Sequence, residues 1–289
     1  MTLIPSREVR LGGFPRTASL RNAGGWASAP LGWGVVFIWA SISPVWYQVE
    51  LRLVVKSPCL LAGWSGSFAY RLLLELLRRA AEPKDRVYAH PLYLDGRPLL
   101  SGVDGRAAAL EPGRAAAVKA VVSQHDLRLL LEAASDPHIK STCELELERL
   151  SFEQLAVELG GSHGFALVKA RFAPTAFMFH GKDVLYPSPQ RLAYSLAKTY
   201  RELFGADLKR LADRAPTAVE LVGYSVRRAW VDIGETRRVP AFMGAAAFAI
   251  YGNVDDWLAL MKLGEAVGVG ISRAIGFGKY KVEAVERLA

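Results

Sequence analysis

The sequence predicts an α+β protein that consists of two tandem βαββαβ units. Two observations support this prediction: some segments alternate apolar and polar residues like half-buried strands, and others place apolar residues at helical spacing. These segments follow one another in the same order twice along the 289 residues. The order is that of the ferredoxin-like unit. We expect one domain over 45–155 and a second over 160–289.

The first unit starts at residue 45, where Val49 and Leu51 alternate with Gln48 and Glu50 in a predicted strand. The helix that follows has apolar residues at helical spacing, and Pro83 ends it. The segments that complete the unit are strands at 86–94 and 113–124, a helix at 125–135 and a strand around 144–148.

The second unit repeats this order without repeating the sequence. A strand over 164–179 is interrupted at Pro174, and Ser188 can cap the helix that follows. The remaining elements are a long hairpin of 218–233 and 237–252, a helix after Asn253 and a closing strand at 279–285.

Residues 1–44 differ from the rest of the chain, and we expect them to be an appendage outside the folded core. The stretch between Arg21 and Glu50 has no charged residue, and 31–47 is strongly apolar. Since about 20 apolar residues can span a bilayer, a membrane anchor within 23–49 is a second interpretation. Prolines and several Gly and Ser residues count against it. An upstream start assignment would also explain the segment.

Composition favours an anionic partner. The formal net charge is +8, which is typical of proteins that bind RNA, DNA or an anionic membrane surface. Cys59 and Cys143 suggest neither a disulfide framework nor a metal site, so we predict a cytoplasmic protein. Few amide side chains, together with many Arg and Glu residues, point to a thermophilic source.

A glycine-rich segment, GVGISRAIGFG at 268–278, follows the last predicted helix. Glycine is used where φ is positive or where another group approaches the backbone closely. A dinucleotide-binding loop follows a strand and opens a helix, which is the reverse of the order here. The phosphate-loop pattern GxxxxGK[ST] does not occur. A tight turn and a loop for a longer polyanion both remain open.

The full pattern is G-h-G-x5-G-h-G, with h hydrophobic, directly before the last strand. It resembles the C-terminal glycine-rich motif of CRISPR-associated RAMP proteins, and in particular the endoribonuclease that cuts CRISPR precursor RNA within its repeats. The segments 171–200 and 237–270 are similar to the same family. The resemblance implies two RAMP/RRM-like domains, and it covers 164–283 in sequence and 45–150 mainly in topology.

The resemblance also implies that the glycine-rich segment lies beside bound RNA. Glycine backbone lets N–H groups approach phosphates, and neutralising several phosphates gives salt-dependent affinity. Aromatic side chains nearby, Tyr224, Trp230 and Phe277, are candidates to stack on bases. The residues expected to bind RNA are Gly268, Gly270, Arg273, Gly276, Gly278 and Lys279 in the segment, with Arg227, Arg228, Arg237 and Arg238 on the preceding hairpin.

For catalysis, the resemblance implies cleavage without a metal ion or other cofactor, in which the 2′-hydroxyl attacks the adjacent phosphate and leaves a 2′,3′-cyclic phosphate. This reaction needs a base, an acid and cations. Among five histidines, His90 has the place of the family's catalytic His after the first helix. Tyr70 in that helix and Arg97 after the His complete the predicted catalytic set. Lys84 and Tyr88 are reserves.

Three function classes stay open from the sequence. The first is a repeat-specific endoribonuclease, and the second is a non-catalytic RNA-binding subunit of a CRISPR effector complex with the same fold. The third is a membrane-anchored protein, which depends entirely on the apolar N-terminal run. CRISPR repeat RNA is the expected partner in the first two, and a second copy of the chain is a further predicted partner.

Overall fold

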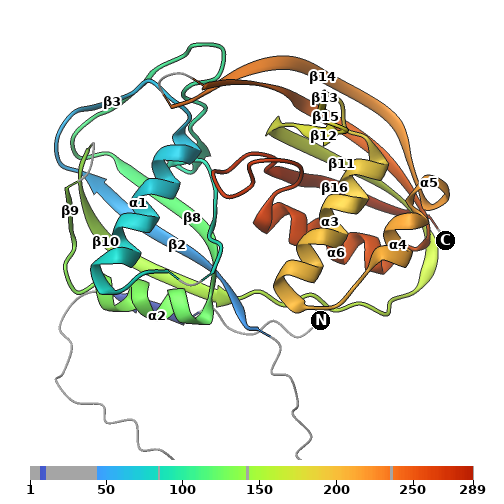
Figure 1. Ribbon diagram of the computed structural model, residues 1–289, viewed down its shortest axis with the longest axis horizontal. Helices are drawn as coiled ribbons and strands as arrows, with labels where there is room; N and C mark the ends of the chain where they lie inside the picture. Colours follow the sequence, from blue (N-terminus) through green and yellow to red (C-terminus); the bar gives the residue numbers. More distant parts are fainter. Residues whose placement is uncertain (1–6, 11–43, 84, 141–142, 235–236, 289) are drawn as a thin grey trace, which may run out of the picture.

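The computed structural model describes residues 7–10, 44–83, 85–140, 143–234 and 237–288. They form two α+β domains that lie side by side and are joined by extended chain around residue 155 (Figure 1). Most of the predicted appendage, the reserve residue Lys84 and part of the predicted 234–236 turn lie outside the described residues.

The N-terminal domain is a βαββαβ unit with the sheet order β10-β2-β8, where β8 also pairs with β4 and β5. Helices α1 and α2 cover one face of this sheet. The first strand of the unit therefore lies between the last and the third, as in a ferredoxin-like fold. The elements of the unit are β2 (Trp46–Val55), α1 (Ser65–Ala80), β4 (Tyr88–Ala89), β5 (Tyr93–Leu94), β8 (Ala115–Ser123), α2 (Gln124–Ala133) and β10 (Glu144–Gln154).

Shorter strands extend this domain. Some of them pair with the strands at the two edges of the sheet, and two others form a separate two-stranded ribbon. These strands are β1 (Arg7–Arg10) and β9 (His138–Lys140) on β10, β6 (Arg97–Pro98) on β5, and β3 (Cys59–Leu61) paired with β7 (Ala108–Leu110).

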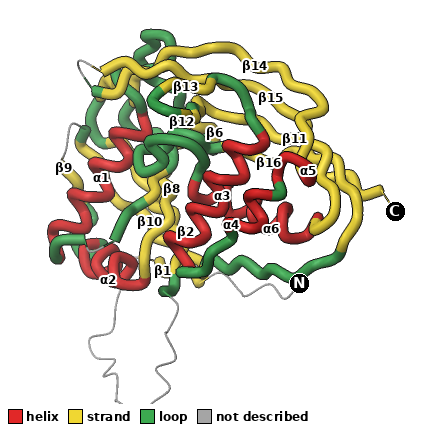
Figure 2. The backbone as a smooth tube through the Cα atoms, turned by 45° about the vertical axis from the view of Figure 1, so that its right-hand side comes forward, coloured by secondary structure: helices red, strands yellow, loops and turns green. Residues whose placement is uncertain are grey.

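The C-terminal domain repeats the unit with the sheet order β14-β15-β11-β16. Helices α3 and α6 lie together on one side of this sheet (Figure 2). Its elements are β11 (His163–Thr175), α3 (Pro189–Phe204), β14 (Val219–Ile233), β15 (Arg237–Asn253), α6 (Val254–Val267) and β16 (Tyr280–Leu288), with the additions β12 (Phe177–Phe179), β13 (Lys182–Val184), α4 (Lys209–Asp213) and α5 (Ala215–Ala218).

The predicted fold class, two tandem ferredoxin-like domains, is confirmed, and the differences are local. The strand predicted over 86–94 is two short strands, because Pro91 between them cannot donate a ladder hydrogen bond. The strand predicted over 164–179 is divided into two strands. The first, β11, ends at Thr175, and the second, β12, pairs with β13. In the described residues, the longest apolar helices fall short of the length and hydropathy that crossing a membrane requires.

Two features of the N-terminal domain differ from expectation. Arg7–Arg10, within the predicted appendage, pairs with β10 at the edge of the sheet. Cys59 and Cys143 form a disulfide with a Cα–Cα separation of 5.5 Å. The two cysteines are 84 residues apart, so only the fold, and not their spacing, brings them together.

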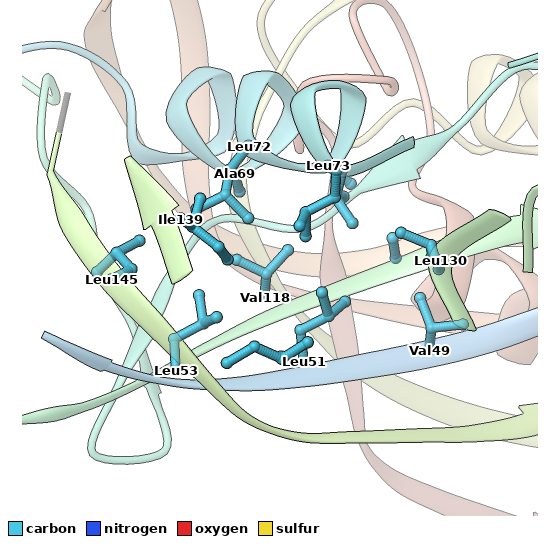
Figure 3. Packing of buried hydrophobic residues seen from close by; sticks show 14 of the residues in the cluster. Val49, Leu51, Leu53, Ala69, Leu72, Leu73, Val118, Leu130, Ile139 and Leu145 are labelled. Carbon is cyan, nitrogen blue, oxygen red and sulfur yellow. The ribbon is translucent and has the colours of Figure 1, made fainter. Parts of the chain in front are cut away.

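Each domain has its own hydrophobic core. In the N-terminal domain, Leu51 and Leu53 of the sheet pack against Leu72 and Leu73 of α1, with Val118 of β8 between them (Figure 3). The C-terminal core lies between its sheet and the two helices α3 and α6. Trp46, Tyr88 and Val121 of the N-terminal domain belong to that second core, so the two domains bury apolar surface against each other.

A third hydrophobic cluster lies at the junction between the domains. The hairpin of β14 and β15 extends over to the N-terminal domain, where Trp64 and Val103 pack with Val231 and Phe277 (Figure 1). Backbone hydrogen bonds join the same segments, since Trp64 N–H donates to Asp232 O at 2.8 Å. The domains therefore share both apolar and hydrogen-bonded contacts.

Two tryptophans provide a test of this junction. Trp46 and Trp64 each donate an indole N–H to a carbonyl of the other domain, Leu203 O and Ile275 O, both at 2.6 Å. We expect Trp46→Phe and Trp64→Phe each to leave a carbonyl unpaired and to cost about 1–3 kcal/mol more in the free energy of unfolding than a control. The control is Trp257→Phe, because the Trp257 indole N–H is buried without a partner in the described structure. Equal losses in denaturant titrations of all three variants would contradict this account.

Candidate functional site

His90 lies directly after β4, where the two domains meet. Its backbone N–H donates to Lys119 O at 2.8 Å on β8, and the neighbouring Ala89 N–H donates to Ala274 O at 3.0 Å in the glycine-rich segment. Ala89 and Ile275 also form an isolated parallel bridge. We predicted the glycine-rich segment and His90 as separate sites, but the fold places the segment in contact with the strand that precedes His90.

The imidazole of His90 is held by the end of α6. Its Nε2 lies 2.8 Å from Ala266 O, and its Nδ1 lies 3.4 Å from the Tyr93 hydroxyl. A carbonyl can only accept, so Nε2 carries the proton in the neutral ring. Nδ1 is then the unprotonated nitrogen, and it is the atom that could take a proton from a substrate.

The surroundings of His90 keep it neutral. Burial lowers the pKa of His90 well below its ordinary value, and the positive charges of Lys279 and Lys119 lower it further, while the bond to Ala266 opposes this shift. The imidazole is therefore unprotonated at Nδ1 near neutral pH. This is the state that a general base requires.

Lys279 shares a hydrogen-bond acceptor with His90. Its Nζ donates to Ala266 O at 2.7 Å, so one carbonyl accepts from both side chains. Lys279 is only 4% exposed, and burial lowers its pKa well below the ordinary value. We predicted Lys279 as an RNA contact, but in this structure its side chain points into the protein beside His90.

The glycine-rich segment uses its backbone within the protein. All four glycines have positive φ, between 70° and 88°. The N–H of Gly270 donates to Ser195 Oγ at 2.8 Å, and the N–H of Gly278 donates to Pro174 O at 2.9 Å. Gly268 and Gly276 likewise donate to protein carbonyls. The N–H groups that we expected to face phosphates are thus already paired.

Close packing explains why one of these glycines is required. A Cβ at Gly276 would lie 2.8 Å from Pro91 N and 2.9 Å from the carbonyl carbon of His90. Those distances are too short for any side chain to fit without moving backbone. Gly276 therefore permits the segment to press against the strand that carries His90.

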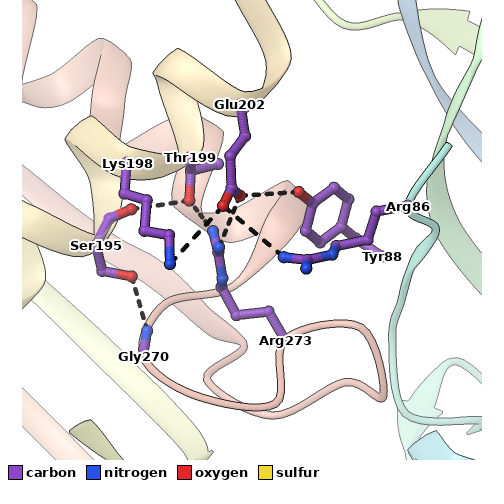
Figure 4. A network of polar contacts seen from close by, with 8 residues as sticks. All are labelled: Arg86, Tyr88, Ser195, Lys198, Thr199, Glu202, Gly270 and Arg273. Atoms are coloured by element: carbon purple, nitrogen blue, oxygen red, sulfur yellow. Dashed lines mark hydrogen bonds and ion pairs between the residues drawn. The ribbon is translucent and has the colours of Figure 1, made fainter. Parts of the chain in front are cut away.

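Arg273 anchors the segment to α3 (Figure 4). Its guanidinium is buried, donates to Glu202 Oε2 at 2.8 Å, and also donates to Thr199 Oγ1. The same Glu202 oxygen accepts from the Tyr88 hydroxyl at 3.1 Å. The network therefore connects the glycine-rich segment, α3 and β4, and it contains the guanidinium of Arg273, which we predicted as an RNA contact.

The charges in this network explain its protonation states. Burial raises the pKa of Glu202, but Arg273, the Tyr88 hydrogen bond and the Lys198 charge together leave that pKa below its ordinary value. Burial and the Glu202 charge raise the pKa of Tyr88 to about 12. The hydroxyl of Tyr88, a reserve catalytic residue, therefore stays protonated and donates a hydrogen bond to Glu202.

The structure does not assemble the predicted catalytic set as a whole. Tyr70 packs against the N-terminal core, and Arg97 is exposed on β6. Neither is hydrogen-bonded to His90 in the part of the chain that the structure describes. The hydroxyl beside His90 belongs to Tyr93, which sequence reasoning missed because the pairing of β5 with β8, and not a motif, places it there.

The hairpin residues that we predicted to bind RNA lie on β14 and β15. Arg228 and Arg238 lie over the Trp230 ring, 4.6 and 5.6 Å from its centre, and Trp230 is 37% exposed. Arg227 is paired with Asp104 at 2.7 Å. Arg237 and Tyr224 are exposed, whereas Phe277 is fully buried and is not available to stack on a base.

Comparison with known proteins finds similarity to one family in the part of the chain that contains α3 and the glycine-rich segment. Residues 171–280 match the family model of the CRISPR-associated endoribonuclease Cas6. The resemblance to CRISPR-associated RAMP endoribonucleases is confirmed. A Cas6 endoribonuclease of Mycobacterium tuberculosis (strain CDC 1551 / Oshkosh) is 33% identical over 116 residues, which are 38% of this chain and 36% of that protein. The chain thus matches about a third of the length of its curated relatives.

Solved Cas6 structures share the fold. A Cas6 product complex has a TM-score of 0.60 at 20% identity, over 82% of this chain and 99% of that chain. Thermus thermophilus Cas6 has a TM-score of 0.59 at 17% identity, over 83% and 99%. A Cas6 substrate mimic complex has a TM-score of 0.55 at 16% identity, over 82% and 99%. At these identities, the likeness establishes the two-domain fold.

The shared carbonyl gives a prediction about pKa. Lys279→Met removes a positive charge beside His90 and keeps the buried volume similar, so the pKa of His90 should rise toward its ordinary value of about 6.5. The measurement is an NMR titration of the imidazole carbons. Lys56→Met, at the far end of β2 from Trp46, is the matched control and should leave the pKa of His90 unchanged. An unchanged pKa in Lys279→Met would show that Lys279 does not act on His90.

Proposed function

We propose that this protein is an endoribonuclease that cleaves CRISPR precursor RNA within its repeats. The observation that carries the proposal is the position of His90 at the domain junction, where Nε2 lies 2.8 Å from Ala266 O and the glycine-rich segment contacts the adjoining strand. The proposed reaction is attack of a 2′-hydroxyl on the adjacent phosphate, which leaves a 2′,3′-cyclic phosphate and needs no metal ion.

The geometry supports a role for each group around His90. Nδ1 of His90 takes the proton of the 2′-hydroxyl, displacing its contact with Tyr93. Burial raises the pKa of Tyr93, so its hydroxyl stays protonated and can donate to the leaving oxygen. The Lys119 ammonium lies 5.2 Å from the centre of the Tyr93 ring and supplies positive charge for the phosphorane. Tyr70 and Arg97 stay predictions for contacts that form only with RNA.

RNA binding is proposed at the exposed side chains of the β14–β15 hairpin. Arg228 and Arg238 flank Trp230 there, so cations for phosphates lie next to a ring on which a base can stack. Arg227 and Arg237 extend this surface. Two solved neighbours are described as a product complex and a substrate mimic complex, which supports CRISPR repeat RNA as the ligand of this fold.

A second candidate function is RNA binding without cleavage, as a subunit of a CRISPR effector complex. It is favoured by one observation: both ring nitrogens of His90 already have partners within the protein. One assay distinguishes these two functions. Repeat RNA incubated with the protein in excess EDTA is cut at one site, with a cyclic phosphate end, if the protein is the proposed enzyme. Tight binding without any cut would support the subunit.

His90→Ala provides the residue-level test. We expect it to slow single-turnover cleavage by about 100-fold or more with little change in RNA affinity, because a general base is lost. His138→Ala on β9 is the control and should cleave like the wild type. In the wild type, the rate should hold as the pH falls through about 6.5 and decline only at lower pH, where Nδ1 protonates. A His90→Ala variant with the wild-type rate would remove His90 from the mechanism.

A further inference from the structure

One face of α3 carries cations from the β12–β13 hairpin to the strand of His90. Arg191, Lys198 and Glu202 are separated by seven and four residues, so they lie along the same side of the helix. Ser195 and Thr199 on this side hold the glycine-rich segment through Gly270 and Arg273. The exposed part of this face therefore runs past the segment that positions His90 (Figure 4).

At one end of this face, the hairpin presents an aromatic ring among cations. Phe179 is 46% exposed, and the Arg191 guanidinium lies 3.9 Å from its ring centre. Phe179 is directly opposite Lys182 in the hairpin register, so the two share a face. The acidic Asp183 is paired with Met178 on the other face. The Phe179 face is thus aromatic and positively charged.

At the other end, two exposed cations flank Glu202. Lys198 and Arg86, whose side chains are 61% and 60% exposed, lie 3.9 and 3.8 Å from its carboxylate. Arg273 already pairs with that carboxylate at 2.8 Å, so the three cations exceed the single negative charge. Arg86 comes four residues before His90, on the segment that leads into β4.

We propose that these residues, here named the α3 strip (Phe179, Lys182, Arg191, Lys198 and Arg86), bind a single-stranded segment of the RNA. A base stacks at Phe179, the cations contact successive phosphates, and the strand continues to the scissile phosphate at His90. This inference rests on the proposed function, and it adds a binding site to it. Stacking on an aromatic ring beside cations suits single-stranded nucleic acid of any sequence.

Helix geometry sets the length of RNA that the strip would hold. Arg191 and Glu202 are 11 residues apart, which corresponds to about 16 Å along the axis of α3. At about 3.4 Å per stacked nucleotide, this length corresponds to about five nucleotides. We therefore expect one strand to contact Phe179 and the other end of the strip at the same time only if it is longer than about five nucleotides.

The test uses fluorescein-labelled oligouridylates of about 4 to about 16 nucleotides, with affinity measured by fluorescence anisotropy. We expect Phe179→Ala to weaken the binding of oligomers longer than about five nucleotides about tenfold. Lys198→Gln should weaken binding and reduce the slope of log affinity against log salt by about 0.7, the value for one phosphate contact on a single strand. Lys56→Gln, an exposed ion-paired lysine at the far end of β2, should change neither quantity.

Either of two results would overturn the α3 strip. One is no binding of any oligomer by the wild type, and the other is wild-type binding by both Phe179→Ala and Lys198→Gln. Cleavage of repeat RNA, measured on the same proteins, is an independent readout. If the α3 strip binds RNA but the protein does not cut repeat RNA, the strip is supported and the proposed enzyme is rejected.

Discussion

The contact between the glycine-rich segment and the strand of His90 is the constraint on which the rest of the site depends. Ala89 N–H bonds to Ala274 O, and Gly276 lies against the backbone of His90 and Pro91. Because this is a backbone contact between the two domains, the position of His90 is fixed by how the domains pack. The imidazole then reaches the Ala266 carbonyl at the end of α6, which fixes its tautomer.

Burying charged groups at this junction is costly unless each has a partner. Arg273 has Glu202 and Thr199, and Lys279 has the Ala266 carbonyl. Both side chains connect segments at the junction, and Lys279 also sets the electrostatic surroundings of His90, which stays neutral beside it. In the proposed function, the cations that contact RNA are exposed side chains on the β14–β15 hairpin and along the α3 strip.

Strand and helix periodicity was sufficient to predict both βαββαβ units, because each depends on local patterns of apolar residues. The glycine pattern predicted the resemblance to CRISPR-associated RAMP proteins, but the structural role of the segment was harder to predict. Positive φ and close contact with His90 depend on the packing of two domains, and no spacing in the sequence reveals it. The burial of Arg273, the Tyr93 hydroxyl beside His90 and the Cys59–Cys143 disulfide were missed for the same reason.

The central claim is that the glycine-rich segment positions His90 and does not itself bind RNA. Gly276→Ala tests it most directly, with Gly96→Ala as the control, since both glycines have positive φ but only Gly276 contacts His90. In folded protein, we expect Gly276→Ala to slow single-turnover cleavage at saturating repeat RNA at least tenfold while the RNA Kd stays near that of Gly96→Ala. A raised Kd with an unchanged rate at saturation would contradict the account, because it would make the segment an RNA-binding loop.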